Sequence, residues 1–326
     1  MDVPNQSPSA PASRAEALRR FRFGDQLFRR TTKASALLVL LIMVGIIISL
    51  IVGAWPALHT FGLGFIFSAS WNPVTEQFGA LASIYGTIIT SAFAMLLAVP
   101  VGLGIAIFLT EICPYWLRRP VGIAIELLAG IPSIIYGIWG LFVFVPFVQT
   151  TVQPAIIALF APIPLLNQLF AGPAYGIGLM TAAFILAIMV LPFITAISRD
   201  VFLTVPTVLK EAAFGIGCTR WEVVRSVVIP YTRVGLIGGI MLGLGRALGE
   251  TMAVTFVIGN AARISPSLLA PGTTISATIA NEFSEAFGAT YLSSLIALGL
   301  ILFVITFIVL AMSRLLLMRI ESTRAK

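Results

Sequence analysis

Six apolar stretches constrain the fold of this chain more than any other feature of its sequence. Each exceeds the roughly 20 mainly apolar residues that a helix needs to cross a bilayer. They cover about 34–55, 83–110, 121–147, 174–198, 234–259 and 290–313. A membrane barrel would instead need alternating segments of about 10 residues. Because a backbone in lipid must satisfy its own hydrogen bonds, the predicted fold class is an all-α integral membrane protein with six transmembrane helices.

The composition is that of a membrane protein and excludes most enzyme chemistry. Of the 326 residues, 59% are hydrophobic and 10% are charged, which would leave a soluble fold almost no polar surface. With two cysteines, one histidine and no clustered carboxylates, we predict neither a metal site nor a nucleophile–base pair. The chain also lacks the glycine-rich phosphate loop of an ATPase. It is therefore predicted to be no enzyme and to hold no cofactor; any ATP and Mg bind a partner ATPase.

The basic residues predict the orientation in the membrane. Eighteen of the 20 lysines and arginines lie on one side of the six predicted spans, while Arg263 lies on the other side and Arg246 within a span. Short cytoplasmic loops carry such an excess of positive charge, so both termini are predicted to be cytoplasmic. This bias accounts for the basic character of the chain, and no nucleic-acid partner follows from it.

The expected organisation is one membrane domain between two cytoplasmic tails. The N-terminal tail is 1–33, the six-helix permease-like domain is 34–316, and the C-terminal tail is 317–326. The first apolar run is too long for a cleaved signal and is expected to remain as an anchor. Arginines alternate with apolar residues in Arg14–Lys33, which fits an interfacial amphipathic helix and fits plain positive-inside bias equally well.

The cytoplasmic loop 200–232, between spans four and five, is predicted to hold two short helices around a glycine turn. Pro206 suits the start of the first helix, and Gly217 suits the turn after it. The run TRWE at 219–222 is a capping box that starts the second helix, and Pro230 is expected to mark its end. Such a pair presents a compact surface to a cytoplasmic partner.

The spacing in this loop resembles the EAA loop of ABC importer permeases. The three letters alone are common, but here they are followed by a glycine six residues after the glutamate and by a Val-x-Ile-Pro ending on the predicted cytoplasmic side. In that family the loop docks into a cleft of the ATPase subunit. The resemblance therefore implies that the residues coupling the chain to an ATPase are Glu211, Ala212, Ala213, Gly217 and Pro230.

Other segments resemble the phosphate-specific permeases of the PstC type. The similarity is carried by FGALASIYGTIITS, PVGLGIAIFLTE, ELLAGIPSIIYGIWGLFVF, GRALGETMAV and PGTTISATIANEFSEA, within 71–313. It implies a type I ABC importer (MetI-like) permease of the bacterial inner membrane, which moves inorganic phosphate by alternating access. The implied partners are two copies of a PstB-type ATPase, a PstA-type second permease and a PstS-type phosphate-binding protein. Two alternatives are a related importer for molybdate or sulfate, and a stand-alone secondary transporter.

Arg246 and Glu250 are the only charges in 234–259. A charge near the centre of a membrane helix costs about 2.5–3.5 kcal/mol, so such residues usually face a protein interior or a water-filled path. At 100° per residue the two share a helix face and are expected to pair. The same face carries a stripe of small residues suited to close helix packing, Gly235, Gly239 and Gly243.

Two interpretations of this pair stay open. In one, the Arg246 fork binds the oxyanion in a substrate pathway or gate, Glu250 holds the arginine in place, and Thr251 offers a hydroxyl. In the other, the two charges form a buried ion pair that fixes helix register without touching substrate. A threonine in a membrane helix more often bonds back to its own turn, so Thr251 is the weaker candidate.

Span three contains two further candidates for gating. Glu126 is expected about six residues into the span, where a helix N-terminus makes a carboxylate tolerable, and a structural role is favoured for it. Pro132 is expected to kink the span and free a carbonyl for Ser133. Beyond this span, 150–173 is expected to be an outer loop, and 275–287 an outer amphipathic helix; the family resemblance implies that the latter faces the binding protein.

Overall fold

The computed structural model describes residues 11–324, with side chains described for residues 24–318 apart from 165 and 316. The chain divides into two compact units, Met1–Val52 and Gly53–Lys326. Helix α1 (Pro11–Phe61) continues from the first unit into the second. In the first unit its apolar side chains from Leu37 to Val52 are largely exposed. The predicted amphipathic segment Arg14–Lys33 lies in this helix, but its side chains before Gly24 fall outside the described ones.

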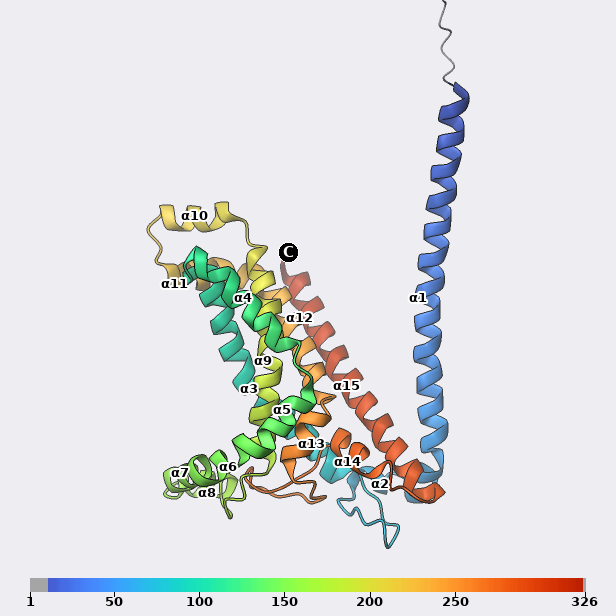
Figure 1. Cartoon of the computed structure of the whole chain (residues 1–326), viewed down its shortest axis with the longest axis vertical. Helices are drawn as coiled ribbons and strands as arrows, with labels where there is room; N and C mark the ends of the chain where they lie inside the picture. Colours follow the sequence, from blue (N-terminus) through green and yellow to red (C-terminus); the bar gives the residue numbers. More distant parts are fainter. Residues whose placement is uncertain (1–10, 325–326) are drawn as a thin grey trace, which may run out of the picture. The chain divides into compact units, whose positions relative to one another are not determined.

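The helices follow one another with few long loops (Figure 1). After α1 they are α2 (Gly64–Phe67), α3 (Leu81–Ile107), α4 (Tyr115–Ala129), α5 (Ser133–Trp139), α6 (Val145–Phe147), α7 (Gln153–Phe160), α8 (Pro164–Leu169), α9 (Leu179–Leu203), α10 (Thr207–Gly215), α11 (Arg220–Val223), α12 (Ile229–Leu248), α13 (Met252–Ile258), α14 (Ile275–Glu282) and α15 (Ala289–Arg324). Four π-helical turns join some of them, η1 (Phe108–Ile112), η2 (Gly140–Phe144), η3 (Val148–Val152) and η4 (Val224–Val228).

Six helices of the described chain are long and apolar enough to cross a membrane, which confirms the predicted six-span fold. They are Gly24–Phe61, Leu81–Ile112, Ser133–Phe160, Leu179–Leu203, Arg220–Leu248 and Ala289–Leu315. In Figure 1, α10 and α11 lie at one end of the bundle, and α7, α8 and α14 lie at the other. The two polar surfaces predicted for opposite sides of the membrane therefore occupy opposite ends of this unit.

Helix α9 is the centre of the second unit. Two-thirds of its most apolar window is buried, against α3 on one side and α12 on another. The three glycines of the predicted stripe lie on the α12 side of this packing: a Cβ on Gly239 would stand 2.6 Å from Ile197, and one on Gly243 would stand 3.0 Å from Ile194. Gly235 likewise faces Val201. The helices approach so closely because these positions carry no side chain.

The third predicted span, 121–147, is wrong as one continuous helix. Helix α4 ends at Ala129, and α5 begins after Pro132, whose ψ of 137° is extended. Proline lacks an N–H and disfavours a helical residue before it, so the chain breaks here and does not merely kink. The Tyr136 hydroxyl, and not Ser133, donates to the freed Leu128 carbonyl at 2.9 Å.

The segment 150–173 is also more ordered than the expected loop. The third span continues through η3 and α7 to Phe160, and α8 follows within the expected loop. Pro146 and Pro154 are tolerated because each stands in the first turn of a helix, beside a π-helical turn. Gln153 is fully buried there, and its side-chain carbonyl accepts the Gly176 N–H at 2.9 Å.

The fifth predicted span, 234–259, is likewise interrupted. Helix α12 ends at Leu248, and α13 begins at Met252. The second segments of the two interrupted predicted spans, α5 and α13, pack on each other. Gly137 of α5 makes this contact so tight that a Cβ would lie 2.7 Å from Phe256 and 3.0 Å from the Met252 carbonyl.

Candidate functional site

The interruption of the fifth span places Glu250 at the start of a new helix. Its carboxylate accepts the N–H of Ala253 at 3.2 Å, so the side chain caps α13. A carboxylate is stabilised at this end of a helix, where backbone N–H groups are unpaired. Thr251 is the N-cap residue, and its hydroxyl donates to the Gly249 carbonyl at 3.3 Å, within its own turn.

The expected ion pair between Arg246 and Glu250 is wrong for this structure. Arg246 lies in the last turn of α12, and the helix that would set the two side chains one turn apart ends between them. Within the described residues, Arg246 makes neither an ion pair nor a side-chain hydrogen bond, and it is exposed. Its guanidinium donors are therefore not used by any described side chain or carbonyl and are accessible from outside the chain.

Glu126 is held by an arginine and not by a helix N-terminus. It lies in the last turn of α4, because that helix begins at Tyr115 and ends at Ala129, so the expected N-terminal position is wrong. Arg199 of α9 lies 2.7 Å from Glu126 and 3.0 Å from Asp200. The pair ties α4 to α9 at the end of the bundle that carries α10.

The loop 200–232 folds into the two helices that its sequence predicts. Pro206 is the N-cap residue of α10, and the chain turns through Gly217 at a left-handed φ of +91°. Thr219 accepts the Glu222 N–H, while the Glu222 carboxylate accepts the Thr219 N–H at 2.7 Å. The predicted capping box is thus formed in full.

Pro230 does not end the second helix, contrary to expectation. The helix runs without a break from α11 through η4 into α12, and Pro230 stands in the first turn of α12. The π-helical turn of 224–228 widens the backbone just before the proline, which relieves the clash of its ring with a preceding carbonyl. The loop 200–232 is therefore continuous with the fifth span.

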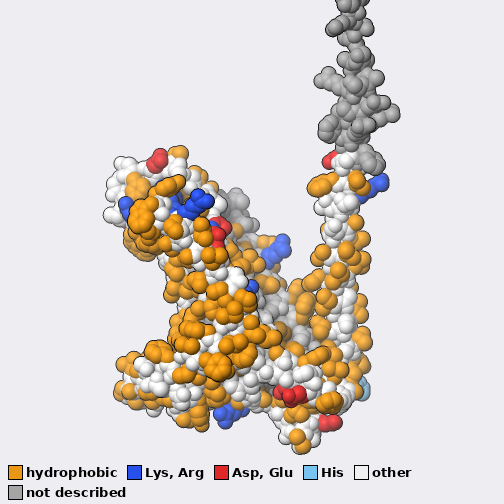
Figure 2. Space-filling view, in the orientation of Figure 1, with side chains coloured by type: hydrophobic (Ala, Val, Ile, Leu, Met, Phe, Trp, Pro, Cys, Tyr) orange, Lys and Arg blue, Asp and Glu red, His pale blue; other side chains and the backbone are white. Residues whose placement is uncertain are grey.

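The surface of α10 around Glu211 is largely apolar. Glu211 and Ala212 are exposed, whereas Ala213 is buried in a cluster with Phe202 and Val223. The exposed apolar side chains around them are Val208, Leu209, Phe214, Ile216 and Trp221. Figure 2 shows hydrophobic side chains at this end of the unit beside acidic and basic ones. Such a surface is typical of a protein interface.

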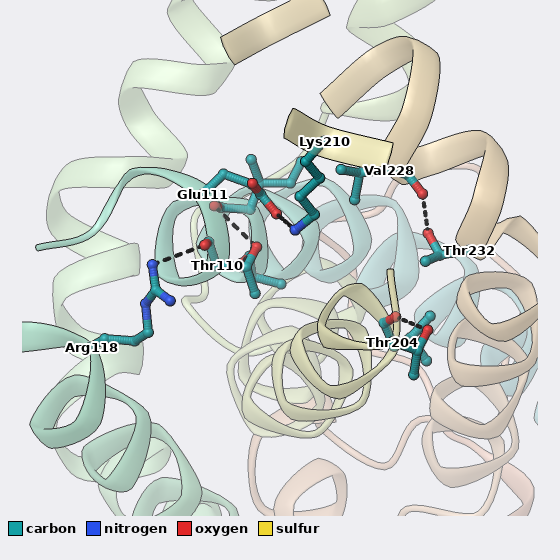
Figure 3. Close-up of polar contacts among 10 residues, drawn as sticks. Thr110, Glu111, Arg118, Thr204, Lys210, Val228 and Thr232 are labelled. Atoms are coloured by element: carbon teal, nitrogen blue, oxygen red, sulfur yellow. Dashed lines mark hydrogen bonds and ion pairs between the residues drawn. The ribbon is translucent and has the colours of Figure 1, made fainter. Parts of the chain in front are cut away.

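A partly buried ion pair that the sequence analysis missed anchors this loop to span two. Lys210 Nζ donates to Glu111 Oε1 at 2.5 Å, and only 17% and 10% of the two side chains are exposed (Figure 3). Glu111 lies in η1 at the end of span two, and Lys210 lies in α10. The one available signal was that Glu111 is an acid at the end of an apolar run whose neighbouring loops are basic.

At the opposite end of the unit, α14 confirms the expected helix within 275–287. Its Glu282 is not free: the carboxylate accepts the Trp71 indole N–H at 2.5 Å and the Tyr291 hydroxyl at 2.7 Å. Glu285 remains exposed. The helix is therefore fixed to the neighbouring segments, and one exposed acid, Glu285, follows just after its end.

Comparison with known proteins gives a consistent family. Residues 98–322 match the family described as binding-protein-dependent transport system inner membrane component. The chain is 70% identical to the phosphate transport system permease protein PstC of Mesorhizobium japonicum, over 97% of this chain and 96% of that one. It is 57% identical to the protein of the same name from Pasteurella multocida, over 93% and 94%.

Solved structures show the same fold at low sequence identity. A bacterial ABC transporter that imports the acidic polysaccharide alginate superposes with a TM-score of 0.54 at 17% identity, over 90% of this chain and 99% of that one. The inward-facing MetNI methionine ABC transporter gives a TM-score of 0.52 at 19% identity, over 74% and 94%. The fold is thus that of a MetI-like importer permease.

Proposed function

Since the chain belongs to the family of binding-protein-dependent transport system inner membrane components, we infer that it is the non-catalytic permease subunit of an ATP-driven importer of inorganic phosphate. The observation that carries this inference is the 70% identity, over nearly the whole length of both chains, to a phosphate transport permease. The protein is a multi-pass protein of the inner membrane, and it works in a complex with an ATPase and a binding protein.

We propose that the finer composition is one PstA-type permease beside this chain, two PstB-type ATPases and a PstS-type phosphate-binding protein. Both termini and the α10–α11 loop would then be cytoplasmic, as the bias of lysines and arginines favours. The outer end, with α14 and exposed Glu285, would face the binding protein. Opposite ends of the unit are thus available for the two soluble partners.

In this proposal Glu211, Ala212 and their apolar neighbours on α10 dock into the ATPase. When ATP closes the ATPase subunits, α10 moves, and the partly buried Lys210–Glu111 pair passes that motion to the end of span two. The second route is the continuous helix from α11 into α12, which includes Gly217 at its entry and Pro230 within it. Both routes end on helices that pack against α9. Alternating access follows from the movement of these helices.

Arg246, with Glu250 and Thr251 beside it, is proposed to line the phosphate pathway. Support comes from an arginine that is exposed in the single subunit and has no partner within the described chain, while Glu250 is occupied in capping α13. A planar guanidinium fork matches phosphate oxygens. The opposite wall would come from the second permease. Glu126 and Pro132 are proposed to gate through the joint between α4 and α5, without contacting substrate.

Uptake of radiolabelled phosphate at low micromolar concentration tests both the substrate and the arginine. Cells lacking this chain receive the wild type, Arg246→Gln, or the control Arg314→Gln, an exposed arginine of α15. We expect the wild type and the control to restore uptake, and Arg246→Gln to fail at normal membrane levels. Equal uptake by Arg246→Gln would contradict phosphate contact at this arginine.

Two further arms separate the alternatives. Tenfold excess molybdate or sulfate should leave phosphate uptake unchanged, and competition by either would favour that oxyanion as the substrate. The exchanged variant Arg246→Glu with Glu250→Arg should also be inactive, because it moves the cation to a capping position. Transport by the exchanged variant would favour a purely structural role for the two charges.

A further inference from the structure

A pocket of about 450 Å³ lies between span two, α4 and α9, near the end of the unit that carries α10. It is lined by Leu109 and Thr110 of η1, by Ile123 of α4 and by Leu203 of α9, among others. The pocket is separate from the interrupted fifth span and from the outward surface of α10. Of its lining residues only Glu126 has a part in the proposed transport mechanism, and that part does not account for the pocket.

The pocket has an excess of positive charge. Three guanidinium groups line it, those of Arg118, Arg119 and Arg199, against the single carboxylate of Glu126. Arg199 is neutralised by Glu126 at 2.7 Å and by Asp200 at 3.0 Å. In the described chain, neither of the other two arginines has a carboxylate within ion-pair distance. Arg118 and Arg119 therefore leave the pocket with unneutralised positive charge, which suits an anion.

The Arg118 guanidinium is held in place by one hydrogen bond, and another of its donors has no partner within the described residues. Its Nη2 donates to the Thr110 carbonyl at 3.0 Å, which holds the guanidinium at the pocket wall (Figure 3). Its Nε–H is buried and has no hydrogen-bond partner within the described residues. A buried donor without an acceptor is costly, so the Arg118 guanidinium is only partly satisfied by the described chain. Guanidinium groups bind phosphate oxygens through paired N–H groups.

The rim of the pocket is aromatic and apolar, which distinguishes a lipid from a soluble anion. Tyr115 and Trp116, in the first turn of α4, are 90% and 75% exposed. Ile123 and Leu203 also present apolar side chains outward. Tyrosine and tryptophan collect where acyl chains meet headgroups, and arginines there bind acidic lipids. Inorganic phosphate would leave these apolar walls in water.

We propose that this pocket binds the phosphate headgroup of an anionic phospholipid from the leaflet on the α10 side, with an acyl chain along Ile123 and Leu203. The lipid completes the charge balance of Arg118 and Arg119. It also braces Thr110, whose neighbour Glu111 holds Lys210 of the loop 200–232. An acidic lipid is therefore a structural partner of that loop, independent of which ion the importer carries.

The test is native mass spectrometry of the complete purified transporter, titrated with phosphatidylglycerol or with zwitterionic phosphatidylethanolamine. We expect preferential retention of phosphatidylglycerol by the wild type. Arg118→Gln with Arg119→Gln should weaken it about 25-fold, at about fivefold for each arginine near an anionic lipid. Arg119→Gln alone, which removes no intramolecular hydrogen bond, should weaken it about fivefold and guards against misfolding of the double variant.

The matched control is Arg29→Gln with Arg30→Gln, an adjacent arginine pair on α1. Its affinity for phosphatidylglycerol should match that of the wild type, and 5 mM inorganic phosphate should not displace the lipid. Equal loss in the control pair would reduce the effect to general electrostatics and overturn the proposal. Displacement by inorganic phosphate would assign the pocket to the free ion. Unchanged lipid binding in both Arg119→Gln and the double variant would show that the lipid does not bind at this pocket, and would overturn the proposal.

Discussion

Removal of the Lys210 ammonium should release α10 from the end of span two. At the 2.5 Å separation of Nζ and Oε1, with an effective dielectric constant of about 20, Coulomb's law gives an attraction of about 7 kcal/mol. Desolvation of two largely buried groups offsets much of this, but removing one partner leaves the other charge unpaired. Breaking a buried pair costs about 3–5 kcal/mol, and the lower end applies here because both groups keep some contact with solvent. Lys210→Met should therefore lower the free energy of local opening of α10 by about 3 kcal/mol, which raises the population of the open form about 150-fold.

Hydrogen exchange measures that opening directly. Amides of residues 207–215 in the purified complex should exchange about 150-fold faster in Lys210→Met than in the wild type, because the lost ion pair holds this helix against the end of span two. Lys33→Met, which also removes an ammonium but from exposed α1, is the matched control and should leave these amides unchanged. Phosphate uptake should fall in parallel with the loss of protection.

The exchanged pair Glu111→Lys with Lys210→Glu distinguishes an ion pair from simple packing. It retains opposite charges at the same two positions, so most of the protection of α10 should return. If Lys210→Met changes exchange less than threefold, or if the exchanged pair is as open as the single variant, the pair does not hold α10 and the proposed route to span two fails.

Two further changes test close packing and capping. Gly86→Ala would place a Cβ 1.8 Å from the Thr273 carbonyl oxygen, and we expect a loss of about 3 kcal/mol, seen as a lower melting temperature of the purified complex. Gly104→Ala, in the same helix with no atom within 4 Å, should be neutral or stabilising, and equal melting of the two variants would contradict the packing argument. Thr219→Ala should lose about 1 kcal/mol of local stability at α11, measured by hydrogen exchange, whereas Thr219→Ser should retain it; similar exchange in both would argue against the cap.

Local sequence patterns were enough for the membrane spans and for the loop 200–232. Hydropathy alone predicts six spans, since a membrane helix needs only length and apolar side chains. The capping box of Thr219 and Glu222, and the turn at Gly217, depend on residues within a few positions of each other. Such features form in the same way in many contexts, so their pattern in the sequence is informative.

The interruptions and the partly buried ion pair depend on contacts that no local pattern contains. Hydropathy continues across Gly249, so nothing in 234–259 indicates that α12 ends there and that Glu250 caps a new helix. The break at Pro132 is stabilised by the Tyr136 hydroxyl, which donates to the Leu128 carbonyl. Hydropathy cannot predict this contact, because it depends on a hydrogen bond and not on apolar character. Glu111 and Lys210 are 99 positions apart, and only the tertiary fold brings them together.

The packing of α5 on α13 joins parts of the two interrupted spans into one block that can move as a unit. The two helices are locked through Gly137 against Phe256, while each joins the preceding helix of its predicted span through only three non-helical residues, 130–132 and 249–251. A rotation of that block bends these two joints and breaks no hydrogen bond inside a helix. Arg246 stands before one joint, and Glu250 lies within it with its carboxylate bound to α13, so the distance between the two side chains becomes a direct gauge of how far the block has turned.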